Sequence, residues 1–81
     1  MEVGQRVGKE QDGVCLEHIG IIHETPSGWK TEVNVVSWFG KEGKIDIRNW
    51  STDYSKSSPH SLFSDEEMEI LIGLMSDRLR V

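Results

Sequence analysis

The sequence has little from which covalent or membrane-based stability could be built. It contains one cysteine in 81 residues, so no disulfide can form within the chain, and this composition is typical of proteins in a reducing, intracellular compartment. No apolar run approaches the ~18 residues of a membrane span, and the N-terminus lacks the basic and then apolar pattern of a secretory leader. We therefore expect a cytoplasmic protein with no membrane partner.

Motifs of catalysis and metal binding are also lacking. There is no glycine-rich phosphate-binding loop, and no nucleophile has a base at motif spacing. Cys15, His18 and His23 have a ligand-like spacing, but alternation along a strand would separate His18 from the other two. Cys15 is more simply interpreted as a small core residue. The sequence predicts no enzyme, no cofactor, no metal and no small-molecule substrate.

The length allows one small domain. A chain of 81 residues buries only about 60–65% of the surface that it exposes when unfolded. Such a domain is marginally stable without disulfides or a metal. A homodimer would supply the missing buried surface.

Charge is unevenly distributed along the chain. The formal net charge is −5, made up of −3 in residues 1–26, +1 in residues 27–63 and −3 in residues 64–81. Five of the six aromatic residues fall between positions 29 and 54, in the basic segment. A basic segment with interleaved aromatics is typical of surfaces that stack nucleobases, although a solvated sheet with tryptophans in its core has the same composition.

The pattern along the chain predicts an α+β fold of β-β-β-β-α type. Residues 1–12 are expected to form a flexible N-terminal arm, and residues 13–81 a single domain. Strands are expected over 15–24, 30–38 and 44–50, with a short final strand over 61–63, in an antiparallel meander. Turns are indicated by the Thr25–Gly28 and Gly40–Gly43 segments.

The C-terminal segment 64–79 predicts a helix. Ser64 and Glu67 have the spacing of a capping box, and acidic residues in the first turn suit the helix dipole. The apolar stripe is wider than packing on one small sheet requires. Part of it is therefore expected to form the dimer interface, through Ile70, Leu71, Leu74 and Met75.

Alternation assigns two faces to the predicted sheet. Odd-numbered residues of the second and third strands, such as Val33 and Ile47, are small and apolar and are expected against the helix. Even-numbered residues, among them Trp38 and Trp50, are expected to point away from the helix into solvent. A hairpin centred on Lys41 would pair even with even residues, with Trp38 opposite Lys44. Asp46 is expected to pair with Arg48 or Lys44.

The run from Gly28 to Trp38, followed by Lys44-Ile45-Asp46-Ile47-Arg48-Asn49-Trp50, resembles the bacterial YdbC-type members of the positive cofactor four (transcriptional coactivator) family. The resemblance covers roughly residues 14–80. It implies a homodimer of four-stranded antiparallel sheets, with helices at the dimer interface, that binds single-stranded DNA with little sequence preference in transcription regulation or DNA maintenance, and so a nucleoid-associated protein.

The resemblance also implies particular contacts. Trp38 matches the family's stacking aromatic, Lys41 and Lys44 its basic hairpin, and Arg48 and Trp50 the arginine and aromatic that follow. The family's fourth strand is rich in lysine and glycine, whereas here Lys56 is the one basic residue carried over. The expected DNA-binding residues, with Lys30 added from its place on the same face, are Lys30, Trp38, Lys41, Lys44, Arg48, Trp50 and Lys56.

Two other interpretations of the tryptophan-bearing face remain open. A dimeric adaptor could use it to hold a protein or peptide. Single-stranded RNA could bind in place of DNA, since stacking does not distinguish the sugars.

Overall fold

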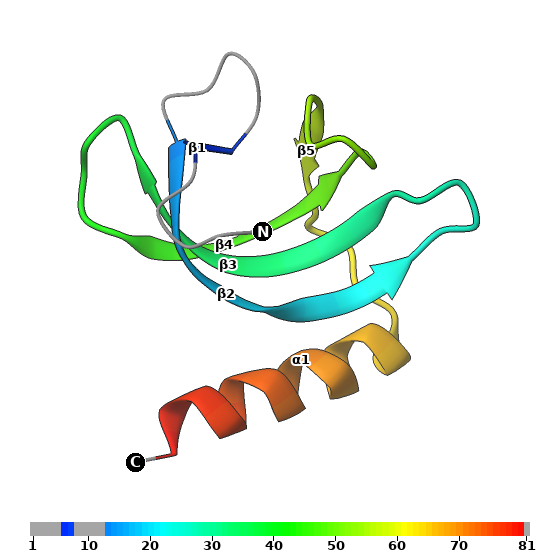
Figure 1. Ribbon diagram of the computed structural model, residues 1–81. Coiled ribbons are helices and arrows are strands. Elements are labelled where there is room, and N and C mark those ends of the chain that lie inside the picture. Colours follow the sequence, from blue (N-terminus) through cyan, green and yellow to red (C-terminus); the bar gives the residue numbers. More distant parts are fainter. Residues whose placement is uncertain (1–5, 8–12, 81) are drawn as a thin grey trace.

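The computed structural model describes residues 6–7 and 13–80. They form one antiparallel sheet and one helix, in the order β1 (Arg6–Val7), β2 (Gly13–Glu24), β3 (Lys30–Trp38), β4 (Lys44–Trp50), β5 (Ser57–Pro59) and α1 (Asp65–Leu79). Each strand pairs with the next along the chain (Figure 1). The predicted α+β fold, a four-stranded meander followed by one C-terminal helix, is confirmed in β2–β5 and α1. The short β1 extends the sheet, and the rest of the predicted arm over residues 1–12 lies outside the described residues.

The sheet is strongly curved because β2 carries three bulges. Register shifts between Cys15 and Glu17, His18 and Gly20, and Ile21 and His23 place three extra residues in β2 opposite the regular β3. Each bulge bends its strand and increases the local twist. The sheet therefore curls into a trough, with α1 beneath its outer side and with β1 and β5 on the side away from the helix (Figure 1).

The hairpin between β3 and β4 has a register that differs from the expected one. Val36 pairs with Lys44 and Asn34 with Asp46, two residues away from the expected pairing of Trp38 with Lys44. β3 still ends at Trp38, but its pairing with β4 ends at Val36, which leaves a wider loop, in which Gly40 has a φ of 74°. Even residues still meet even residues, so the division into two faces holds.

The final strand is also displaced from its expected place. β5 covers Ser57–Pro59 and pairs with the end of β4, and the expected strand over 61–63 is wrong. Pro59 is tolerated there because β5 is an edge strand, where a missing backbone N–H is not needed by a further neighbour.

The helix begins and packs as its sequence indicates. Ser64 accepts a hydrogen bond from the Glu67 backbone N–H at 3.1 Å, and the Glu67 carboxylate accepts one from the Ser64 N–H at 3.0 Å, which completes the capping box. The hydrogen bond from the Ser64 N–H is the main cause of a lowered pKa of Glu67.

Within the described residues, no helix is both long enough and apolar enough to cross a membrane.

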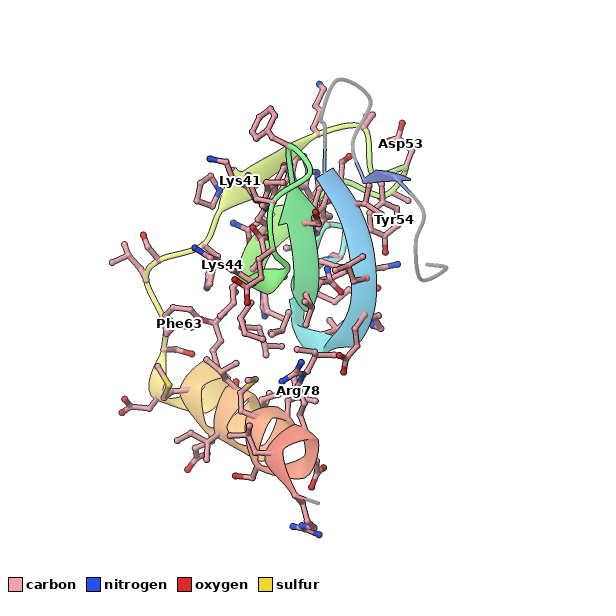
Figure 2. The ribbon with its side chains drawn as sticks, turned by 90° about the vertical axis from the view of Figure 1, so that its left-hand side faces the viewer. Lys41, Lys44, Asp53, Tyr54, Phe63 and Arg78 are labelled. Carbon is pink, nitrogen blue, oxygen red and sulfur yellow. The ribbon has the colours of Figure 1, made fainter. Side chains whose placement is uncertain are left out.

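The helix covers β2 on the odd face of the sheet, as expected. A Cβ atom placed on Gly20 would lie 2.6 Å from a methyl carbon of Leu74, so a larger residue there would require Leu74 to shift. Gly20 pairs with the fully buried Val33. Arg78 donates to Glu17 at 3.2 Å from the other end of the helix, and Figure 2 shows Arg78 between α1 and the sheet.

Candidate nucleic-acid interface

Trp38, Asp46 and Arg48 form an interlocked group at the end of the sheet that carries the β3–β4 loop. The Trp38 indole N–H donates to an Asp46 carboxylate oxygen at 3.0 Å, and Arg48 Nε donates to the same oxygen at 3.2 Å. The Arg48 guanidinium carbon lies 4.8 Å from the centroid of the Trp38 ring, in a cation–π arrangement. The expected pairing of Asp46 with Arg48 is confirmed. The carboxylate holds the arginine over the indole ring.

Phe39 extends this group into solvent. It follows Trp38 directly, its ring centroid lies 6.5 Å from that of Trp38, and 66% of its surface is exposed. Its φ of 56° is unusual for a bulky residue and costs about 1–2 kcal/mol. Phe39 was not predicted as a site residue, because the alternation of faces ends with the strand at Trp38. The sequence feature that could have indicated Phe39 is its place as a second aromatic residue next to a turn glycine.

Two lysines complete the surface. Lys41 and Lys44 are exposed and lie on the same side of the molecule, with Lys41 farther from the helix (Figure 2). The Lys41 backbone N–H donates to the Trp38 carbonyl at 3.0 Å, and its carbonyl accepts from the Ser37 hydroxyl at 2.6 Å. We call Trp38, Phe39, Lys41, Lys44 and Arg48 the hairpin surface. The structure thus brings four of the seven expected DNA-binding residues together.

Trp50 is not part of any exposed surface, and the expectation that it faces solvent is wrong. Its side chain is 0% exposed and forms the core of the trough with Cys15 and Val36. Tyr54 covers it, with ring centroids 5.8 Å apart. The physical reason is the curvature of β2, which converts the middle of the even face into an interior.

The same curvature buries polar side chains that the sequence indicated as exposed. Glu32 and Asn34 are 1% and 0% exposed. The Tyr54 hydroxyl donates to one Glu32 carboxylate oxygen, and Asn34 Nδ2 donates to the other at 3.2 Å. These hydrogen-bonded side chains form a row that ends at His18, whose Nδ1 lies 2.7 Å from Asn34 Oδ1. Burial, and then the bond to Glu32, raise the pKa of Tyr54, which therefore stays protonated as the donor.

Lys30 and Lys56 lie at the other end of β3 and β4 from Lys41 and Lys44, and Arg48 Nη1 donates to the hydroxyl of Ser57, the neighbour of Lys56, at 3.4 Å. Lys30 pairs with Trp50 at the start of β3, and its ammonium lies 5.6 Å from the Tyr54 ring centroid. Lys56 follows β4 and closes the loop with Ser51, whose backbone N–H donates to the Lys56 carbonyl at 3.0 Å. These two residues are not brought to the same site as Lys41 and Lys44.

The four residues expected at a dimer interface differ in burial. Leu71, Leu74 and Met75 are half-buried, and Leu74 is in contact with Gly20 of the same chain. Ile70 is 41% exposed. Other exposed apolar residues, which were not predicted at an interface, are Met68, Ile72 and Leu79 on α1 and Leu16, Ile21 and Ile45 on the sheet.

Cys15 is a core residue, as expected. It is fully buried and reduced, and burial raises the pKa of its thiol. The bulges place Cys15 and His18 on the even face and His23 on the odd face, according to their partners Val36, Asn34 and Thr31, so the three still do not converge. Over residues 6–7 and 13–80, no group of three or more potential ligands could hold a metal ion.

Comparison with known proteins gives a relative but no described activity. No family model matches the chain. A protein of Treponema pallidum (strain Nichols), named only as an uncharacterized protein, is 33% identical over 57 residues, which are 70% of this chain and 67% of the treponemal one. This identity over most of both chains is more than a shared composition would produce, and the chain belongs to the same family as the treponemal protein.

Proposed function

We propose that this protein binds single-stranded DNA with little sequence specificity, as a homodimer, through the hairpin surface. The observation that carries the proposal is Phe39, an aromatic ring that is 66% exposed in a strained backbone conformation beside the Trp38–Arg48 stack. Strain of this kind is retained where the surrounding structure or the function requires it. An exposed ring next to a guanidinium plane offers two surfaces on which bases can stack.

The charges around the rings suit a phosphate backbone. Lys41 and Lys44 are exposed, while the Arg48 charge is already paired with Asp46 at 3.2 Å. Two lysines from each of two protomers would neutralise about four phosphates, which predicts a slope near −3 for the logarithm of affinity against that of salt concentration. With a net charge of −5 over the whole chain, stacking should contribute more than counterion release.

Weak sequence preference follows from the groups that are available. The Trp38 indole N–H and Arg48 Nε both donate to Asp46, and Arg48 Nη1 donates to the Ser57 hydroxyl at 3.4 Å, so these groups are already engaged and are not free to read base edges. Stacking on aromatic rings accepts every base. This is also the arrangement that the resemblance to the positive cofactor four family implies, with Phe39 in place of Trp50 as the second aromatic.

The homodimer is supported by apolar surface that α1 leaves uncovered. The helix contacts β2, and no residue of α1 is buried. On the sheet, Ile45 is 44% and Leu16 is 42% exposed, and on the helix Ile72 is 58% exposed. An exposed apolar surface of this kind is typical of an interface, and a second copy of the chain would bury it.

Oligo-dT binding, followed by fluorescence anisotropy, tests the proposal. Phe39→Ala should weaken binding by ~1–3 kcal/mol, the contribution of one stacked base, without loss of the fold. Lys41→Ala should weaken binding and make the salt slope shallower. Lys56→Ala is its matched control, with the same change of charge at the other end of the sheet, and should leave both unchanged.

Three results would contradict the proposal. These are no binding at low salt, an affinity independent of salt, and equal effects of Lys41→Ala and Lys56→Ala. Oligo-U measured in parallel decides whether the sugar matters. Equal affinity for both would extend the proposal to RNA, since stacking alone does not select the 2′-position.

A further inference from the structure

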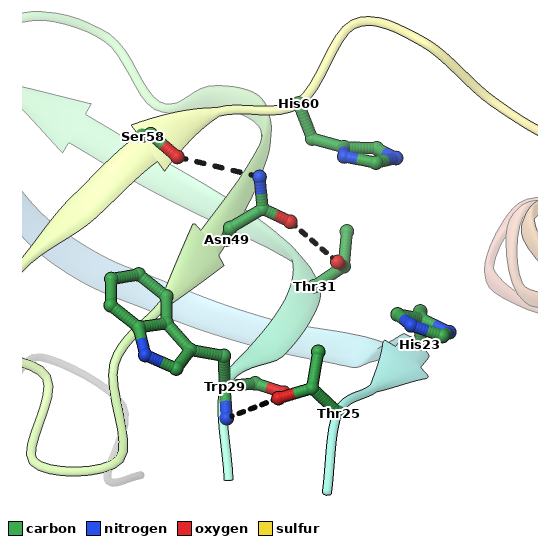
Figure 3. Close-up of a pocket in the computed structure, with 7 residues that line it drawn as sticks. All are labelled: His23, Thr25, Trp29, Thr31, Asn49, Ser58 and His60. Atoms are coloured by element: carbon green, nitrogen blue, oxygen red, sulfur yellow. Dashed lines mark hydrogen bonds between the residues drawn. The ribbon is translucent and has the colours of Figure 1, made fainter. Parts of the chain in front are cut away.

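A second concave site lies on the odd face of the sheet, beside the β2–β3 turn. It has a volume of about 360 Å³ and is lined by Trp29, Thr31, Asn49, Ser58 and two histidines, His23 and His60. Figure 3 shows the Trp29 indole on one side of this pocket, the two imidazoles on the other, and Asn49 between them. The volume lies within the range of about 300–1,000 Å³ that is typical of small-molecule sites. Thr31 and Asn49 belong to the odd face of the sheet, so the pocket is separate from the even-face group of Trp38 and Arg48.

The position of Trp29 is fixed by hydrogen bonds in the β2–β3 turn. The Thr25 backbone N–H donates to the Trp29 carbonyl at 2.8 Å, and the Trp29 N–H donates to the Thr25 hydroxyl at 3.0 Å. Gly28 has a φ of 97°, and a Cβ there would lie 2.4 Å from the Thr52 hydroxyl. The backbone that presents the indole is therefore held before any ligand binds, which lowers the entropic cost of binding.

Asn49 presents unused hydrogen-bonding capacity to the pocket. Its Oδ1 accepts one bond, from the Thr31 hydroxyl at 2.6 Å, and its Nδ2 donates one, to the Ser58 hydroxyl at 3.4 Å. A primary amide can accept two bonds and donate two. One acceptor and one donor site therefore remain on adjacent atoms, and this pair matches the N6 amino group and N7 of adenine.

On the side of the pocket opposite Trp29, His60 is held in place by the first turn of α1 and the residues before it. His60 Nε2 lies 3.4 Å from the Glu67 carboxylate, and its ring packs edge-on against Phe63 with centroids 4.8 Å apart. No lysine, arginine, aspartate or glutamate is among the described residues that line this pocket. A flat, uncharged group with a polar edge suits it better than a charged one.

From the indole wall and the free donor–acceptor pair, we infer that this pocket binds one nucleobase, adenine in preference to the others, stacked on Trp29 and hydrogen-bonded to Asn49. The base can belong to a free nucleotide. The inference does not depend on the binding of single-stranded DNA by the hairpin surface.

Titration with adenosine 5′-monophosphate, followed by the backbone amide resonances in NMR, tests this inference. The nucleotide should shift the amides of Trp29, Asn49 and Ser58 and leave those of Trp38 and Lys41, at the β3–β4 loop, in place. Uridine 5′-monophosphate should bind at least fivefold more weakly, and ribose 5-phosphate, which lacks a base, should shift none of them. The absence of shifts at up to about 10 mM nucleotide, far above the range of functional affinities, would overturn the inference, and so would equal shifts with ribose 5-phosphate.

Two variants separate binding from folding. Trp29→Leu removes the aromatic face and should weaken binding at least tenfold. Asn49→Asp keeps the acceptor for Thr31 but removes the donor, and should abolish the preference for adenine while the fold is retained. Leu62→Ala, a change at an exposed side chain that does not line the pocket, is the control and should leave nucleotide binding unchanged; if it weakens nucleotide binding as much as Trp29→Leu does, the effect of Trp29→Leu is not local to the pocket and the inference is wrong.

Discussion

At the scale of single residues, burial decides what each aromatic side chain can do. Trp38 and Trp50 both lie on the even face of adjacent strands, yet Trp38 is half-buried beside Arg48 and Trp50 is 0% exposed. The difference comes from position along the trough, since Trp38 ends its strand at the rim and Trp50 is covered by Tyr54. Trp50 therefore acts in stability alone, whereas Trp38 packs against the same core and also belongs to the proposed interface.

Truncation of Trp50 should destabilise the protein. Trp50→Ala removes the largest side chain of the core and should lower the free energy of unfolding by about 3–5 kcal/mol, a large part of the 5–15 kcal/mol typical of a domain. Urea denaturation followed by circular dichroism measures the change.

Trp50→Phe is the matched variant. Among the described residues, the Trp50 indole N–H has no hydrogen-bond partner, and a buried unpaired donor costs about 1–3 kcal/mol. The phenyl ring loses volume but also removes this donor, so its effect should be clearly smaller than that of Ala. Equal losses in the two variants would mean that packing on Tyr54 is not what stabilises the core.

At the scale of elements, the loop between β4 and β5 is held by one carboxylate. Asp53 Oδ1 accepts hydrogen bonds from the hydroxyl of Ser55 at 2.7 Å, from its backbone N–H at 3.0 Å and from the Ser51 hydroxyl at 3.0 Å. These bonds, that of the Ser55 hydroxyl first, lower the pKa of Asp53 to about 2. The loop carries Tyr54, so this carboxylate helps to close the trough over Trp50.

The loop should therefore loosen in acid. Because the pKa of Asp53 is lower in the folded chain than in the unfolded one, where it is about 3.9, its contribution to stability is complete above pH 4 and is lost as the pH falls toward 2. Asp53→Asn keeps an acceptor oxygen but removes the charge. The urea midpoints of wild type and Asp53→Asn should differ at pH 6 and converge between about pH 4 and 2; a difference that is constant with pH would exclude this role for the charge.

The helix α1 could be predicted from the sequence, whereas the bulged shape of β2 could not. Local chemistry defines α1, since the capping box of Ser64 and Glu67 is complete within four residues, and it was predicted correctly. The bulges of β2 depend on pairing with β3, and apolar residues such as Ile19 and Ile22 look alike in bulged and regular strands. Without the bulges the even face is flat and open, so Trp50, which is fully buried, was assigned to the wrong surroundings, and Trp38, expected in solvent, is half-buried and packs against the same core.

At the scale of the whole molecule, a thin structure must bury more apolar surface than one copy provides. One layer of sheet with one helix on β2 leaves Ile45 and Leu16 exposed on the sheet. On α1, the exposed side chains of Met68, Ile72 and Leu79 follow each other at spacings of four and seven residues, which places them on one flank of the helix. Ile70 lies two residues from Met68 and so on another flank.

This arrangement identifies the variant that should separate the proposed dimer. Leu74→Asp is unsuitable, because Leu74 contacts Gly20 in the same chain and its loss would damage the fold itself. Ile72→Asp places a charge in the middle of the exposed flank and should convert a dimer to a monomer in sedimentation equilibrium, with the circular dichroism spectrum retained. Ile70→Asp, the same change on the other flank, should have a smaller effect.

Stability should change together with assembly. When folding is coupled to dimerisation, the midpoint of thermal unfolding rises with protein concentration, because association draws the equilibrium toward the folded state. Wild type and Ile70→Asp should show this dependence and Ile72→Asp should not. A monomeric mass for the wild type at every concentration would contradict the dimer and leave the hairpin surface to bind DNA as a single copy, with two exposed lysines and a salt slope near −1.5 instead of −3.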